Sequence, residues 1–251
     1  MIEFNYKALH WNIVFAVGSL HTLPNELDKL GKKRALILTT PNQAEQGREL
    51  AELLGDRAVG LFDQAAMHVP AATLEAATDF CHSLAADCTV ALGGGSTIGL
   101  GKALAVKEGL DNIVIPTSYA GSEMTDIWAV TEAERKVTAR NYAAVPTLTL
   151  YDPQLTLTLP PEFSAASGLN AMAQAVVNVA TDKPSPIISS LAVDGIRALA
   201  ASLPMIMKDP QNIEARSQAL YGASMAGGAL GTGITSLHHR LCHTFGGTFN
   251  T

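Results

Sequence analysis

The order of apolar and polar residues in the first half of the chain predicts alternating strands and helices. Short, continuous apolar runs at 34–40 (RALILTT), 58–63 (AVGLFD), 88–92 (CTVAL) and 112–118 (NIVIPTS) are typical of strands that are buried on both faces. Between these runs, the segments 42–55 and 71–87 place apolar residues at helical spacing. Strands joined by helical crossovers run parallel, so this half predicts a parallel sheet with helices on both faces.

The pattern changes after about Trp128. Two short strand-like segments flank a polar turn and predict a β-hairpin over 128–140, and TLTLYD predicts one further strand over 147–152. Beyond this point the apolar residues recur at helical spacing, and we expect three helices, the third of them broken within its glycines, at 162–180, 185–207 and 213–245.

The predicted elements divide the chain near Pro160. The prediction is an α/β fold in which a Rossmann-like parallel-sheet domain over 1–159 precedes an all-helical domain over 160–251. A chain of 251 residues that is 47% hydrophobic and 16% charged is long enough and apolar enough to bury such cores.

Composition narrows the classes of partner and compartment. The 17 Lys and Arg residues against 23 Asp and Glu residues give a net charge of −6 with no basic block, which argues against nucleic acids and anionic membrane surfaces as partners. The cysteines Cys81, Cys88 and Cys242 are an odd set without a C-x-x-C motif, and the N-terminus has no export signal pattern. We therefore expect free thiols and a cytoplasmic protein. The apolar run 219–237 contains five glycines, which favours packed helices over a membrane span.

A glycine-rich turn lies between the strand 88–92 and the next predicted helix. In the tract CTVALGGGSTIGLGKALAV, glycines let a ligand approach the backbone, and the free N–H groups that begin a helix bind phosphate. The candidate phosphate-binding residues are Gly94, Gly95 and Ser96. The tract matches neither G-x-G-x-x-G nor a Walker loop, so a tight packing turn is the alternative. Lys102, two turns further on, is expected on the surface.

A second turn of this kind follows the strand 112–118. The segment IVIPTSYAGSE supplies three hydroxyl groups around Gly121, from Thr117, Ser118 and Ser122. Two phosphate-binding turns after neighbouring strands favour a dinucleotide over a mononucleotide. The strand 34–40 ends in Thr39, another candidate cofactor residue, and not in an acidic residue that would repel a 2′-phosphate. Both NADH and NADPH therefore remain possible.

Histidines gather near the end of the sequence, at His238, His239 and His243. His239 and His243 are four residues apart and would share one face of a helix. The spacing alone leaves three interpretations open: half of a metal site, the acid of an active site, or two histidines packed in a core.

The motifs GGGST, PTSYAGSE, YDP, SGLNA and HxxxHTFGG occur in one order along the chain, and in this order the sequence resembles the iron-containing alcohol dehydrogenase superfamily from about Phe4 to Thr251. The resemblance implies a dehydroquinate synthase-like fold, a dinucleotide-binding role for the first domain, NADH or NADPH as cofactor, and a homodimer. It also implies that Lys136 contacts the cofactor, although a solvated surface lysine is the alternative. The branch that the chain most resembles reduces maleylacetate, a small dicarboxylate, to 3-oxoadipate in the catabolism of aromatic compounds.

The resemblance also indicates whether the chain binds a catalytic metal. Metal-dependent members bind iron or zinc through an aspartate and three histidines, and the matching positions here are Asn170, Gln174 and His239, while the fourth would fall past Thr251. Carboxamides are poor ligands for such ions, so we expect no catalytic metal. Gln174 replaces a usual histidine and Val177 a usual glutamate even within the metal-independent branch.

Without a metal, the resemblance assigns the chemistry to cationic side chains. We expect His243 to donate a proton or to bind the enolate oxygen, and His239 and Arg240 to neutralise the substrate carboxylates. Two alternatives stay open: a metal-dependent alcohol dehydrogenase of the same superfamily, or a non-catalytic, shortened paralogue that binds nucleotide or a partner chain. The second is considered because superfamily chains continue well beyond the GGTFN tract, whereas this sequence stops at Thr251.

Overall fold

The computed structural model describes residues 3–133, 135–181 and 185–234. Contacts divide the chain into two compact units. The sheet unit spans Trp11–Thr117 and Ile127–Asp152, and the helical unit takes in Ser118–Asp126 together with the described parts of 1–10 and 153–251. The helical unit therefore includes two segments that precede the predicted helical domain in sequence.

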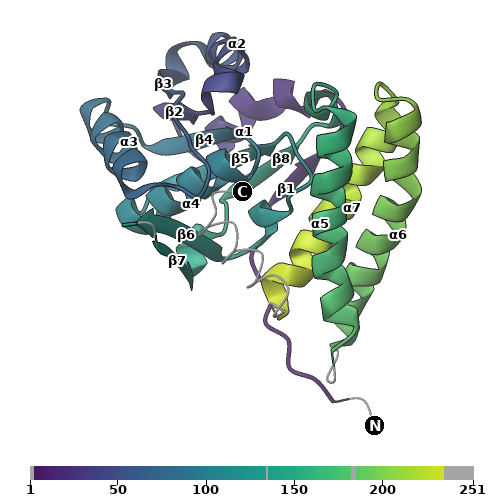
Figure 1. Cartoon of the computed structure of the whole chain (residues 1–251). Coiled ribbons are helices and arrows are strands. Elements are labelled where there is room, and N and C mark those ends of the chain that lie inside the picture. The colour runs from purple at the N-terminus through teal and green to yellow at the C-terminus, as the bar shows by residue number, and fades with distance from the viewer. Residues whose placement is uncertain (1–2, 134, 182–184, 235–251) are drawn as a thin grey trace. The chain divides into compact units, whose positions relative to one another are not determined.

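The described residues of the sheet unit form a six-stranded parallel sheet in the order β1-β8-β5-β4-β2-β3 (Figure 1). The bounds are Ile13–Phe15 (β1), Ala35–Leu38 (β2), Ala58–Phe62 (β3), Cys88–Gly93 (β4), Asp111–Pro116 (β5) and Leu148–Tyr151 (β8). The strands expected from the apolar runs are confirmed, and β2, β4 and β8 are fully buried, as those runs require. Sequence analysis did not predict β1.

Helices and a hairpin complete this unit: α1 (Leu23–Lys29), α2 (Ala44–Leu54), α3 (Ala71–Ser83), α4 (Gly95–Glu108), β6 (Ile127–Glu132) and β7 (Arg135–Arg140). The hairpin β6–β7 is antiparallel, as expected. The hydrophobic core of the sheet unit is made of apolar residues from the strands, from α3 and from α4, among them Leu36, Val114, Leu74 and Leu104. Each such side chain contributes about 1.5–3 kcal/mol when it is fully buried.

Lys102 corrects one expectation about α4. This lysine was expected on the surface, yet its exposed fraction is 1%. The reason is that α4 contacts β4 and β5 on the sheet and also α3, β6 and the 3-10 helix η5 (Tyr142–Ala144). A helix that is covered on several sides has no fully solvated face, so a lysine two turns from its start is enclosed by its neighbours.

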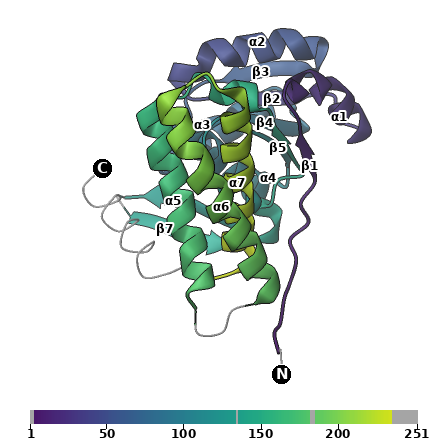
Figure 2. The ribbon, with the colours of Figure 1, turned by 90° about the vertical axis from the view of Figure 1, so that its right-hand side faces the viewer.

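The helical unit contains α5 (Pro161–Val179), α6 (Pro186–Lys208) and α7 (Ile213–Thr232), which pack pairwise against one another (Figure 2). The first two match the predicted helices. The third runs unbroken through Gly227 and Gly228 and ends at Thr232, so the expected break comes only at Gly233, the last glycine of the run.

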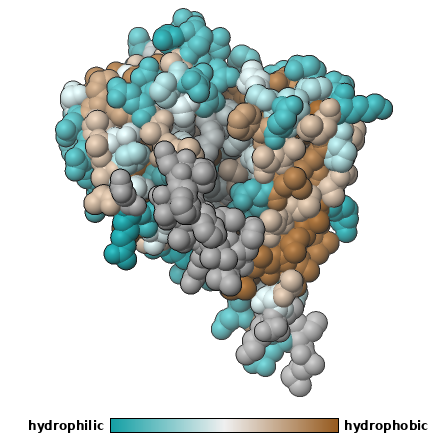
Figure 3. All heavy atoms as spheres, viewed as in Figure 1, coloured by the Kyte–Doolittle hydropathy of each residue, from teal (hydrophilic) through white to brown (hydrophobic). Residues whose placement is uncertain are grey.

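Two features of this unit concern its surface. Among the described residues, α6 is the one helix whose length and apolar composition match a membrane span, but helices packed within soluble proteins meet the same criteria, and α6 packs against α5 and α7. Figure 3 shows apolar side chains gathered over α5 and α6. Large exposed apolar residues of these two helices include Phe163, Leu169, Val176, Val193 and Met205.

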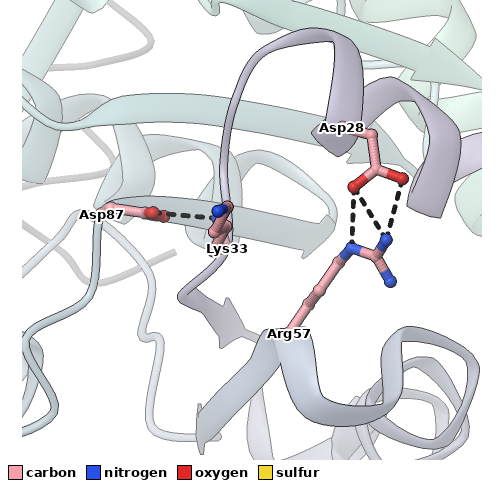
Figure 4. A network of polar contacts seen from close by, with 4 residues as sticks. All are labelled: Asp28, Lys33, Arg57 and Asp87. Atoms are coloured by element: carbon pink, nitrogen blue, oxygen red, sulfur yellow. Dashed lines mark hydrogen bonds and ion pairs between the residues drawn. The ribbon is translucent and has the colours of Figure 1, made fainter.

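Polar contacts join the segments at the end of the sheet where β2 and β4 begin. The Asp87 carboxylate accepts a hydrogen bond from the backbone N–H of Lys33 (2.9 Å), and the Arg57 guanidinium donates to Asp28 at 2.7 and 2.8 Å (Figure 4). Asp87 also accepts a hydrogen bond from the backbone N–H of Arg34 at 3.1 Å. Burial pushes the pKa of Asp87 up, but the hydrogen bonds outweigh burial and the pKa lies below its ordinary value. Thr39 and the glycine turn lie at the opposite, carboxyl ends of these two strands.

Candidate nucleotide-binding site

The strand order reverses between β2 and β4. The chain passes from β2 to β3 on one side, and from β4 to β5 and onward to β8 on the other side. In open parallel sheets, ligands bind outside the carboxyl ends of the strands at such a reversal, because the two adjoining loops diverge there and leave a crevice. Thr39 follows β2 at this point and Gly93 ends β4. The fold therefore places the predicted glycine turn at the position where a nucleotide is expected.

The glycine turn leaves the first turn of α4 open to a ligand. Gly93 has a φ of 154°, and a β-carbon there would lie 2.5 Å from Thr97 Oγ1, so only glycine fits. Gly94 precedes the helix and makes no side-chain cap. Gly95 is exposed, and a β-carbon on it would meet no atom within 4 Å. The N–H groups that begin α4, together with the half-buried Ser96, can therefore bind a phosphate oxygen.

Gln43 links the loops on the two sides of this turn. It ends the 3-10 helix η2 (Pro41–Gln43), and its Nε2 donates to Thr117 Oγ1, after β5, at 3.0 Å. The backbone N–H of Thr117 in turn donates to the carbonyl of Gly93 at 3.0 Å. Sequence analysis predicted Thr117 as a site residue but missed Gln43. No local signal marks Gln43, because its partner lies 74 residues away in sequence.

Two buried threonine hydroxyls at this point lack a hydrogen-bond partner among the described residues, Thr39 Oγ1 and Thr97 Oγ1. Leaving a buried hydroxyl unpaired costs about 1–3 kcal/mol, so such groups commonly serve a ligand or an ordered water. Thr39 is fully buried, and its methyl group lies 3.0 Å from the β-carbon position of Gly47 in α2, so its side chain is directed toward that helix. The open helix start and the orphaned hydroxyls together fit a nucleotide phosphate.

The other predicted cofactor residues belong to different units of the chain. Ser118 directly follows Thr117, and Ser122 begins the 3-10 helix η4 (Ser122–Met124); both are half-buried and belong to the helical unit. Lys136 lies on β7 in the sheet unit, where its Nζ is 3.2 Å from His68 Nδ1. It is half-buried, and burial lowers its pKa, so Lys136 is not a fully solvated surface lysine.

The predicted catalytic residues His239, Arg240 and His243 lie outside the described residues, and their roles stay predictions. The helix α5 carries the two positions that match metal ligands in the resemblance, with Asn170 exposed and Gln174 buried. In 3–133, 135–181 and 185–234 no group of three His, Cys, Asp or Glu residues is placed to bind a metal ion. Neutral carboxamides do not fit iron as carboxylate and imidazole do.

Comparison with known proteins supports the inference from geometry. The model of the iron-containing alcohol dehydrogenases matches residues 11–153, and the model of the C-terminal part of the Fe-containing alcohol dehydrogenase family matches residues 164–251. The chain belongs to the iron-containing alcohol dehydrogenase family. Its two matched regions correspond to the sheet and to the three helices described above.

Several relatives of the chain are maleylacetate reductases. The chain is 51% identical over 249 residues to maleylacetate reductase from Sphingobium indicum, covering 99% of this chain and 70% of the relative. It is 46% identical over 250 residues to maleylacetate reductase from Burkholderia cepacia, covering 100% and 71%. The crystal structure of maleylacetate reductase from Agrobacterium tumefaciens superposes with a TM-score of 0.96 at 46% identity, again covering 100% and 71%. The sulfoacetaldehyde reductase of Bifidobacterium kashiwanohense, solved with NAD+, shares the fold at 21% identity and a TM-score of 0.91.

Proposed function

We propose that this chain catalyses the NADH- or NADPH-dependent reduction of maleylacetate to 3-oxoadipate, a step in the catabolism of aromatic compounds. The observation that carries the proposal is the 51% identity to a maleylacetate reductase over 99% of the chain. The open glycine turn at the reversal of strand order supports it independently, because the reaction needs a bound dinucleotide.

The chemistry fixes what the protein must supply. When bound, the nicotinamide would supply a hydride to the alkene carbon β to the ketone of maleylacetate, and the resulting enolate would need a proton. The protein has to hold the dinucleotide, neutralise two substrate carboxylates, stabilise the enolate oxygen and deliver the proton. In this proposal the turn Gly94–Ser96 and Thr117 bind cofactor phosphate and ribose groups, with Thr39, Ser118, Ser122 and Lys136 as further cofactor residues.

The proton and the substrate charges are assigned to the C-terminal histidine cluster. His243 protonates the enolate or hydrogen-bonds its oxygen, and His239 and Arg240 bind the carboxylates. An imidazolium or a guanidinium can perform these tasks without a Lewis acid, because both combine positive charge with hydrogen-bond donors.

We propose further that the reaction needs no metal. Asn170 and Gln174 support this, since both present neutral carboxamides at the positions where metal-dependent members have an aspartate and a histidine. We also expect a cytoplasmic homodimer with no nucleic-acid or membrane partner. The exposed apolar residues of α5 and α6 support association with another chain, because large apolar patches on protein surfaces commonly mark interfaces.

The test is oxidation of NADH and of NADPH, followed by absorbance, when maleylacetate is added to the purified chain in excess chelator. We expect turnover that survives the chelator and does not rise when iron or zinc is restored. Turnover that appears only with added metal would favour the metal-dependent alternative. Nucleotide binding without any turnover would favour the non-catalytic alternative.

A further inference from the structure

The side chain of Gln43 lies against the carboxyl ends of neighbouring strands in the sheet unit. Gln43 belongs to the loop after β2, and its Nε2 donates to Thr117 Oγ1, after β5, at 3.0 Å. Its Oε1 lies 2.8 Å from the β-carbon position of Gly93, the last residue of β4, which is the strand between β2 and β5. Distances to both polar atoms of the carboxamide therefore place it at the glycine turn.

Hydrogen bonds fix the orientation of this carboxamide. Besides its bond to Thr117, Nε2 of Gln43 donates to Gln46 Oε1, in the first turn of α2, at 3.2 Å. Both hydrogens of the amide nitrogen are then engaged. On the other side, Thr40 Oγ1 donates to Gln43 Oε1 at 3.4 Å. Gln43 consequently presents an N–H group, and not a carbonyl oxygen, to the hydroxyl of Thr117.

This orientation decides what the Thr117 hydroxyl can do. Because Thr117 Oγ1 accepts a hydrogen bond from Gln43, its own hydrogen can be donated elsewhere. Within the part of the chain that the structure describes, no acceptor takes this hydrogen. Thr117 is 6% exposed, so water has little access to it. A buried hydroxyl donor without a protein acceptor suits a charged ligand oxygen, which is the strongest acceptor it can meet.

A second hydroxyl points to a ligand at the same place. Thr97 Oγ1 lies 2.5 Å from the β-carbon position of Gly93, the same point that Gln43 Oε1 approaches. Thr97 is fully buried, and its hydroxyl has no hydrogen-bond partner among the described residues. Thr117 contacts the same glycine, since its N–H donates to the Gly93 carbonyl at 3.0 Å. Two buried hydroxyl donors thus lie around Gly93, beside the open start of α4, where phosphate oxygens need donors.

We propose that Gln43 is a positioning residue that holds the Thr117 hydroxyl as a hydrogen-bond donor to a phosphate oxygen of a nicotinamide dinucleotide bound at the glycine turn. The inference rests on the proposed function only in requiring that the chain bind such a nucleotide. Gln43 acts through Thr117, so the loop after β2 sets the hydrogen bonding of the loop after β5.

The test uses five variants of the full chain. Gln43→Met keeps the length of the side chain and removes the donor, and Gln43→Glu replaces the donor with an acceptor for the Thr117 hydrogen. Thr117→Val removes the hydroxyl, and Thr117→Ser keeps it as the matched control. The fifth variant combines Gln43→Met with Thr117→Val. The measured quantities are the Kd values for NADH and NADPH, from nucleotide fluorescence without maleylacetate, and thermal unfolding as the control for folding.

We expect Gln43→Met to raise the Kd about threefold to tenfold, because the hydroxyl is then free to turn away from the phosphate. Thr117→Val should raise the Kd at least as much, since it removes the donor itself. The double variant should bind as Thr117→Val does, because Gln43 has no effect once the hydroxyl is absent. Thr117→Ser should stay within about twofold of the original chain.

Gln43→Glu gives a readout that a purely structural role would not produce. At about pH 8 its carboxylate repels phosphate and takes the Thr117 hydrogen, so its Kd should exceed that of Gln43→Met. The ordinary pKa of glutamate, about 4.3, is raised by burial and by a bound phosphate. Toward about pH 5 the protonated carboxyl can donate again, and the ratio of the two Kd values should fall. Calorimetry with the oxidised nucleotides measures this series, because the reduced forms decompose in acid.

Three results would overturn the proposal. The first is a Gln43→Met variant that binds nucleotide as the original chain does. The second is a double variant whose Kd exceeds that of Thr117→Val by the full effect of Gln43→Met, which would make the two residues independent. The third is a ratio of the Gln43→Glu and Gln43→Met Kd values that does not change with pH. If the unmodified chain binds nucleotide but does not reduce maleylacetate, the proposed function fails and the binding test of Gln43 still decides; if it binds neither nucleotide, both fail.

Discussion

Gly227 of α7 lies directly against the carbonyl group of Gly121, and a β-carbon on Gly227 would come within 2.2 Å of that oxygen. Gly231, one turn further on, approaches the carbonyl of Met124 in the same way. The segment 118–126, which carries most of the PTSYAGSE motif, therefore packs on α7 through backbone-to-backbone contact. This contact explains why α7 tolerates several glycines that would weaken an isolated helix.

Gly227→Ala should destabilise the protein by about 3 kcal/mol or more, because the new β-carbon collides with the backbone of Gly121, which cannot rotate aside as a side chain can. Thermal and urea unfolding measure the change. The matched control is Gly47→Ala in α2, where the nearest atom to the new β-carbon is the end of the Leu61 side chain at 2.7 Å. That side chain can rotate, so we expect the control to stay within about 1 kcal/mol of the original chain. Equal effects of the two substitutions would contradict this account of the contact.

Alanine substitutions at two glycines of the turn should affect nucleotide binding and stability separately. Gly95→Ala places a methyl group in open space at the start of α4, so unfolding should be unchanged while the Kd for NADH or NADPH rises at least tenfold, since the methyl occupies the approach to the helix N–H groups. Gly93→Ala should instead lower stability, because its β-carbon meets Thr97 Oγ1 at 2.5 Å. An unchanged Kd in Gly95→Ala would show that the turn only packs the strand against the helix.

Arg216 is fully buried and is held by neutral acceptors. Its guanidinium donates to Ser164 Oγ at 2.7 Å, to Tyr119 Oη at 3.2 Å and to the carbonyls of Leu159 and Pro210, both at 3.0 Å. Arg216→Lys should cost about 3 kcal/mol or more, because one ammonium cannot reach all four acceptors.

Tyr119→Phe is the milder variant at the same place. It removes one of the acceptors of Arg216 and should cost about 1 kcal/mol. Chemical unfolding checks both substitutions, and a Tyr119→Phe effect as large as that of Arg216→Lys would show that the phenol, not the arginine, organises this cluster.

His68 should make stability depend on pH in a defined direction. Its pKa in the folded protein lies below the ordinary value of 6.5, so below 6.5 the unfolded chain takes up the proton first. Stability should therefore fall as the pH drops from 6.5 toward the folded pKa, and it should gain nothing more from this group above 6.5. Unfolding free energies measured across this range for the original chain and for His68→Asn isolate the contribution of His68. A difference that does not change with pH would contradict the pKa direction.

Cys81 and Cys88 should be unreactive in the native protein. Burial, followed by the charge of Glu108, raises the pKa of Cys81 to about 11, and burial also raises the pKa of Cys88 strongly. Both side chains are buried. In a Cys242→Ser variant, a thiol reagent at about pH 8 should react only after denaturant is added. Prompt reaction of either thiol without denaturant would contradict their placement.

Local patterns in the sequence predicted most elements of the fold and the glycine turn. Buried parallel strands appear in the sequence as continuous apolar runs. Glycines beside hydroxyl residues indicate a strand-to-helix turn, and this signal does not depend on the rest of the fold. The strand β1 was missed because it is three residues long, with its outer residues Ile13 and Phe15 exposed. Lys102, Gln43 and the pair of His68 with Lys136 depend on contacts between distant segments, and no local pattern contains those contacts.

The most direct test of the proposed function follows the hydride itself. Maleylacetate is reduced with NADH, or NADPH, that carries deuterium at the transferable position of the nicotinamide, and the product is analysed by mass spectrometry and NMR. The account predicts 3-oxoadipate with one deuterium on the carbon β to the ketone, in the presence of chelator. Deuterium on the carbon that bore the ketone, which would indicate carbonyl reduction as in an alcohol dehydrogenase, or a product without deuterium, would contradict it.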